Sequence, residues 1–240
     1  MAGWVGRPVD LSSGVASPAN PMAQLFHPSL NTVCKAVPFA VILVVVSATW
    51  ADWTWQRSSW ETGQGRFVGQ AVPFSHLHHV RGLGIDCRFC HTGVETSSYA
   101  GLPPTKTCMT CHSQIWRDAP MLQPVRDSWG KREPIRWNRV HNLPGYVFFN
   151  HAAHVNNGVG CSSCHGNVAL MPLMYQAASL QMDWCLNCHR HPEQFLRPRD
   201  QIFNTAYEPP ADQAKLGAAL VEQYRILSPR LMQSCSTCHR

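Results

Sequence analysis

Residues Cys161-Ser162-Ser163-Cys164-His165 carry the pattern that decides the fold of this chain: two Cys three positions apart, followed at once by His. Four more stretches have the same form: Cys87-Arg88-Phe89-Cys90-His91, Cys108-Met109-Thr110-Cys111-His112, Cys185-Leu186-Asn187-Cys188-His189 and Cys235-Ser236-Thr237-Cys238-His239. C-x-x-C-H is the attachment motif of c-type haem. The thiols join the vinyl groups at one porphyrin edge, and the His binds the iron on its proximal side. We therefore predict five covalent haems.

Other uses of paired Cys explain this pattern less well. Zinc sites combine C-x-x-C pairs and do not need His directly after each one. A redox dithiol needs one such pair, and disulfides place no demand on the following residue. Of the eleven Cys, only Cys34 lies outside the five motifs, and we expect it to be a spare reduced thiol, with lipidation as the alternative.

A second motif supplies candidates for the distal ligands, which bind each iron on its other side. The sequences Phe74-Ser75-His76-Leu77-His78-His79 and Phe149-Asn150-His151-Ala152-Ala153-His154 each precede two haem motifs. Side chains three positions apart share one face of a helix, and two neighbouring imidazoles cannot sit on opposite sides of one iron. We therefore expect each pair to serve two different haems. The predicted distal ligands are His76, His79, His151 and His154.

The fifth distal ligand is less well defined. His27 falls before the predicted membrane span, His191 is too close to proximal His189, and His78 points away from the His76/His79 face. We predict His141 as this ligand. A Met thioether is the alternative, because Met ligation raises the haem potential. The candidates are Met121, Met171, Met174 and Met182.

The N-terminal part contains one strongly apolar segment. Residues 36–51 include no charged residue, and Trp50, Trp53 and Trp55 follow as an aromatic belt. We expect a cytoplasmic segment at 1–35, a transmembrane anchor at 36–55 and a periplasmic haem domain at 56–240. Within that domain the half-repeats cover 72–115 and 147–192, and the fifth haem is at 235–239. A cleaved signal peptide is the alternative for the apolar run.

Composition favours a mainly α-helical fold with long loops, built around its haems. Charged residues make up 14% of 240 residues, against about 25% in typical soluble domains. Eighteen Pro and sixteen Gly predict many turns. Between 192 and 234 one helix is expected, over 212–226. The net charge of +6 would be largely offset by haem propionates, so it does not predict nucleic-acid binding.

Together these features resemble the pentahaem cytochrome c subunit of alternative complex III. The resemblance covers about residues 22–240, and the haem core is also similar to the c7 or class III multihaem cytochromes. It includes local sequence as well as spacing: Cys108-Met109-Thr110-Cys111-His112-Ser113-Gln114-Ile115, Arg139-Val140-His141-Asn142-Leu143-Pro144 and Met182-Asp183-Trp184-Cys185-Leu186-Asn187-Cys188-His189-Arg190.

The resemblance implies an electron-transfer subunit, without substrate chemistry of its own, in a respiratory or photosynthetic quinol oxidoreductase. The implied partners are an iron–sulfur subunit, polytopic quinol-binding subunits, a monohaem cytochrome c and a periplasmic electron acceptor. Two other functions remain open. A NapC-type quinol dehydrogenase would have its first haem closer to the anchor, and a multihaem oxyanion reductase would need an iron with an open distal position.

Overall fold

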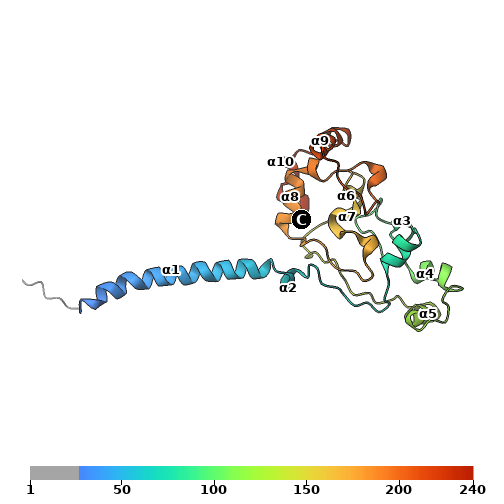
Figure 1. Cartoon of the computed structure of the whole chain (residues 1–240), viewed down its shortest axis with the longest axis horizontal. Coiled ribbons are helices and arrows are strands. Elements are labelled where there is room, and N and C mark those ends of the chain that lie inside the picture. Colours follow the sequence, from blue (N-terminus) through green and yellow to red (C-terminus); the bar gives the residue numbers. More distant parts are fainter. Residues whose placement is uncertain (1–26, 240) are drawn as a thin grey trace, which may run out of the picture. The chain divides into compact units, whose positions relative to one another are not determined.

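The computed structural model describes residues 27–239 (Figure 1). The chain divides at Asp52 into an N-terminal unit and a haem-motif unit that begins at Trp53. The predicted cytoplasmic segment falls largely outside the described residues, up to residue 26.

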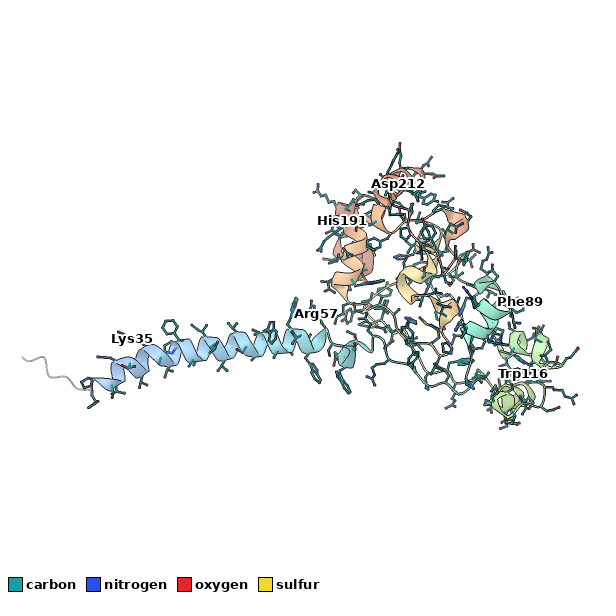
Figure 2. The ribbon with its side chains drawn as sticks, viewed as in Figure 1. Lys35, Arg57, Phe89, Trp116, His191 and Asp212 are labelled. Carbon is teal, nitrogen blue, oxygen red and sulfur yellow. The ribbon has the colours of Figure 1, made fainter. Side chains whose placement is uncertain are left out.

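The N-terminal unit is dominated by one long helix, α1, Ser29–Gln56. It begins at Ser29 rather than at residue 36, because Lys35 is a good helix former and nothing after Pro28 breaks the helix. Its 28 residues extend about 42 Å, and its apolar window has a mean hydropathy of 2.0. None of its residues is buried, and its side chains project outward along its length (Figure 2). Length and composition suffice for a membrane span, although an N-terminal signal sequence has the same properties.

The haem-motif unit consists of short helices joined by long loops, as the sequence predicts. Between residues 27 and 239 there are isolated β-bridges and no strand. The α-helices after α1 are α2 (Ser59–Thr62), α3 (Cys87–Cys90), α4 (Thr105–His112), α5 (Gln123–Lys131), α6 (His151–Val155), α7 (Cys161–His165), α8 (Met182–Arg190), α9 (Gln213–Gln223), α10 (Pro229–Met232) and α11 (Cys235–Cys238). A π-helical turn, η1 (Leu77–Gly82), and four 3₁₀ turns complete the set: η2 (Pro120–Leu122), η3 (Val168–Leu170), η4 (Pro192–Gln194) and η5 (Arg199–Gln201).

Each C-x-x-C-H motif lies in a helical turn. In α3, α7 and α11 the first Cys opens the helix, whereas α4 and α8 begin three residues earlier. The start of α3 is fixed by Asp86, whose carboxylate accepts a hydrogen bond from the Arg88 N–H at 2.8 Å. Because residues i and i+3 share a helix face, both Cys of a motif point in the same direction. The predicted helix over 212–226 corresponds to α9.

The polypeptide by itself has only a thin apolar core. One buried cluster joins Val72, Leu122 and Val125, and another joins Val94, Val155 and Ile202. No side chain in the described residues is less than 2% exposed. Large aromatic side chains next to the haem motifs remain exposed, including Phe89 at 51% and Trp116 at 55% (Figure 2).

Helix α9 packs on η4, α10 packs on α8, and α5 packs on α4 (Figure 1).

Helix α9 approaches η4 through its backbone, because a Cβ at Gly217 would collide with the Glu193 carbonyl oxygen in η4. We expect Gly217→Ala to destabilise the haem-loaded protein by about 2–3 kcal/mol, because α9 must move away from η4. Gly130→Ala is the control. It adds a Cβ where no atom lies within 4 Å, so stability should rise by up to about 1 kcal/mol. Thermal unfolding measures both, and equal stability of the two variants would contradict the packing.

Candidate haem-binding sites

The two Phe-x-His-x-x-His units adopt nearly the same ring geometry. Phe74 stacks on His79 at 4.4 Å between ring centroids and meets His76 edge-on at 4.9 Å. In the second unit Phe149 stacks on the second His at 4.4 Å and meets the first edge-on at 4.8 Å. The second unit is set by Asn150, whose side chain caps α6 by accepting from the Ala153 N–H at 3.2 Å. Each Phe therefore fixes the orientation of two imidazoles.

Three histidine pairs lie at the spacing expected across an iron. The ring centroids of His79 and His112 are 6.1 Å apart, those of His151 and His165 are 6.3 Å apart, and those of His154 and His189 are 6.2 Å apart. An imidazole nitrogen binds a metal at about 2 Å, so two imidazoles on opposite sides of one iron have centroids roughly 6 Å apart. In each pair, one His follows a C-x-x-C and the other is a predicted distal ligand.

His76 interacts electrostatically with His91, the histidine of the remaining motif of the first half. Burial first, and then the charges of His91 and His79, lower the pKa of His76 to about 4. His76 is therefore neutral at pH 7, the form that binds iron. That the two His of each unit serve different haems stays a prediction.

Most of these imidazoles are held through Nδ1 by a backbone carbonyl. A carbonyl only accepts, so Nδ1 carries the proton and Nε2 keeps its lone pair for a metal. The contacts are His79 with Ser75 (2.8 Å), His91 with Gly101 (2.7 Å), His112 with Ile115 (3.1 Å), His151 with Ser98 (2.9 Å), His154 with Asn150 (2.8 Å), His189 with Met232 (2.9 Å) and His239 with Tyr146 (3.2 Å). No sequence pattern pointed to these carbonyl partners.

His165 is the exception among the proximal histidines. Its Nδ1 lies 3.1 Å from Nε2 of His141, a side-chain imidazole. Burial first, and then the charge of His141, lower the pKa of His165 to about 3, which keeps it neutral.

Among the described residues, no ring contact joins His141, the predicted fifth distal ligand, to His239. His141 has its ring contact with His165, at 4.3 Å and 80°, which is too close for an iron between them. His239 has a ring contact with Tyr146, at 5.8 Å between centroids. Among the Met candidates, Met171 is buried, Met174 is half-buried, and Met121 and Met182 are exposed. A fifth distal ligand from this set stays a prediction.

Burial raises the thiol pKa of several of the motif cysteines. All eleven Cys, which lie within the described residues, are free of disulfide bonds. Burial raises the pKa of Cys161 to about 11 and that of Cys164 to about 12. Redox dithiols instead have lowered pKa values, so these sites differ from a thiol–disulfide centre.

Arg197 is a buried cation that the sequence did not single out. It is 6% exposed, its guanidinium donates to the Ser163 hydroxyl at 3.1 Å and to the Asn204 carbonyl at 3.2 Å, and its Nε has no partner among the described residues. No described carboxylate forms an ion pair with it. A buried charge needs a counter-charge, which a haem propionate can supply.

These observations fit haem better than a directly bound metal ion. Between residues 27 and 239 no group of three or more His, Cys, Asp or Glu is placed to hold an ion. The imidazoles come instead as separated pairs with protonated Nδ1 atoms, next to paired Cys. With a buried cation that has no acidic partner among the described residues and a thin apolar core, the chain has the donor set and the exposed apolar surface that haem binding would use.

Comparison with known proteins agrees with this class. Residues 147–240 match the family described as cytochrome c7 and related cytochrome c, so this part of the chain is similar to multihaem cytochromes of that family.

A more particular likeness extends beyond that domain. The chain is 34% identical over 131 residues to a protein of Nitratidesulfovibrio vulgaris named menaquinone reductase, multiheme cytochrome c subunit. The match covers 54% of this chain and 59% of the relative's length.

Proposed function

We propose that this chain is a membrane-anchored pentahaem cytochrome c that relays electrons between the quinone-reactive part of a membrane complex and a periplasmic partner. The observation that carries the proposal is the set of three His pairs spaced 6.1–6.3 Å apart, each with one member in a C-x-x-C-H motif. In this arrangement one Phe-x-His-x-x-His unit holds two haems close together, which an electron relay requires.

The ligand assignment follows the same geometry. The five proximal ligands are His91, His112, His165, His189 and His239, and the ten Cys of the motifs bind the haems covalently. His76, His79, His151 and His154 are the distal ligands. Haem supplies one-electron exchange when it is bound. The protein's own residues supply neutral imidazoles, fix their Nδ1 protons through carbonyl acceptors, and place the buried guanidinium of Arg197 beside the third motif.

The anchor is helix α1, with the N-terminus cytoplasmic and the haem domain periplasmic. Trp53 and Trp55, at 58% and 59% exposed, suit the boundary between lipid and water. The Arg57 guanidinium lies 3.3 Å from the Trp53 ring centroid, so a positive charge lies at the same proposed boundary between lipid and water.

Within this function the complex is alternative complex III. Electrons then pass from a quinol-oxidising iron–sulfur subunit, through the five haems, to a monohaem cytochrome c or another periplasmic acceptor. Polytopic subunits bind the quinol. The sequence resemblance over residues 22–240 supports this choice.

The name of the relative favours a second candidate, in which electrons flow the other way and reduce a quinone. The assembled complex distinguishes the two. Rapid reduction of its haems by added quinol, followed by reduction of a soluble cytochrome, supports the oxidising direction. Haem oxidation by added menaquinone, with no reduction by quinol, supports the reducing direction.

The haem number is directly measurable. We expect the intact mass of the mature chain to exceed that of the polypeptide by five haems. The double variant Cys235→Ser/Cys238→Ser should carry four, since its remaining motifs are unchanged. Fewer than five haems on the unaltered chain would contradict the proposed function.

A further inference from the structure

One of eight Nδ1 contacts among the assigned iron ligands differs from the others. Seven of these imidazoles have a backbone carbonyl at Nδ1, and His165 has the Nε2 atom of His141 at 3.1 Å. A backbone acceptor is present whatever the side chains are. The His165 contact instead depends on one replaceable residue, which the sequence suggested as an iron ligand.

The two rings meet in a geometry suited to a hydrogen bond. They are edge to face, with 80° between their planes and 4.3 Å between their centroids. The segment that carries His141 is braced by a hydrogen bond from the Arg139 guanidinium to the Asn142 amide oxygen at 2.8 Å. The ring of His151 lies 6.3 Å from that of His165 and is nearly parallel to it. Because Nδ1 of His165 contacts His141, Nε2 of His165 is left for an iron, and the distance to His151 is the one that fits an iron between two rings.

The proton positions follow from this arrangement. Binding iron through Nε2 leaves the proton of His165 on Nδ1, so this nitrogen must donate. His141 then accepts through Nε2 and keeps its own proton on Nδ1.

We propose that His141 is not a distal ligand but a positioning residue that accepts the Nδ1–H hydrogen bond of proximal ligand His165. The inference rests on the proposed function, because it requires the haem at Cys161–Cys164. An imidazole nitrogen is a more basic acceptor than an amide carbonyl, so it places more electron density on His165. Added electron density stabilises the ferric state, and His141 thereby lowers the potential of the third haem.

The test compares His141→Leu with His141→Gln in the full-length, haem-loaded protein. Leu cannot accept a hydrogen bond, whereas the Gln side-chain oxygen can, much as the backbone carbonyls do. We expect both variants to carry five haems and to show no high-spin signal beyond that of the unaltered protein. In the Leu variant the reduction equilibrium constant of one haem should rise about threefold to tenfold. One of the five midpoint potentials therefore rises by about 30–60 mV for a one-electron step. The Gln variant should recover most of this shift.

His191→Leu is the matched control, because it also removes an imidazole and is 52% exposed beside Glu193. It should leave all five potentials in place. A high-spin signal or carbon monoxide binding in both His141 variants would identify His141 as an iron ligand and overturn the inference. Unchanged potentials in His141→Leu would overturn it as well.

Two further measurements keep the test decisive. If His141→Leu does not assemble, His141→Gln decides: a low-spin spectrum with a smaller upward shift supports the inference, and a high-spin spectrum or no shift contradicts it. Haem number is determined first on the unaltered chain. If the unaltered chain lacks the third haem, the proposed function itself is contradicted. If it carries five haems whose potentials do not change in the His141 variants, only the role of His141 is contradicted.

Discussion

Without attached haem, residues 53–240 are expected to lose cooperative folding. The polypeptide buries only small clusters such as Val72, Leu122 and Val125, and no described side chain is less than 2% exposed. Fixing the backbone costs about 1–2 kcal/mol per residue, and such a thin core cannot offset that cost over this length. When folding depends on a bound group, the binding free energy becomes folding free energy.

Circular dichroism and calorimetry check this result on a chain made without haem attachment, with the mature protein as control. The haem-free chain should show no near-ultraviolet signal and no cooperative thermal transition. Removing single haems should lower the free energy of unfolding by different amounts. Removing the fifth haem, at the exposed Cys235, should lower it less than removing the third haem with Cys161→Ser/Cys164→Ser. The site of the third haem lies among His141, His151 and Arg197. A native-like cooperative melt of the haem-free chain would contradict the haem-built core.

The second large effect is expected at the distal positions. We predict that His79→Ala gives one high-spin, carbon monoxide-binding haem, because the ring that lies 6.1 Å from His112 is removed. Losing an imidazole donor also destabilises ferric iron. The potential of that haem should rise by an amount of the order of 0.1 V, within the roughly 0.8 V over which axial ligands act.

The neighbouring His78 provides a matched control on the same helical turn, η1. His78 is exposed and contacts His79 and Trp116 rather than a proximal ligand. His78→Ala should therefore keep all haems low-spin and leave their potentials unchanged. Electron paramagnetic resonance and redox titration separate the two variants. A high-spin signal from His78→Ala with none from His79→Ala would reverse the assignment.

Local sequence predicted much of the fold and of the candidate sites. Motifs such as Cys161–His165 place their thiols on one face of a helical turn because three-residue spacing does so in any helix. The same rule separates His76 and His79 from His78. Helix α9 was predicted because an apolar periodicity follows Pro209 and Pro210, and the structure differs from that prediction only at the ends.

Contacts between distant segments were not predictable in the same way. Arg197 is 34 positions from Ser163, and nothing in its local sequence distinguishes it from an exposed Arg. The sequence also did not predict that α1 begins at Ser29, ahead of the predicted membrane span. A charged residue such as Lys35 ends an apolar stretch of sequence but does not end a helix.

Sequence alone determined the residues that carry the predicted chemistry: five C-x-x-C-H motifs, two Phe-x-His-x-x-His units, an apolar N-terminal helix and a mainly helical, loop-rich domain. These features depend on residue type and on spacings within one helical turn, so they can be read without a fold. The tertiary structure decided which imidazole faces which. It brings His79 toward His112, His154 toward His189, and Nε2 of His141 to Nδ1 of His165. Such pairings join loops far apart in the chain, and only the packed arrangement of those loops fixes the distance and angle between two rings.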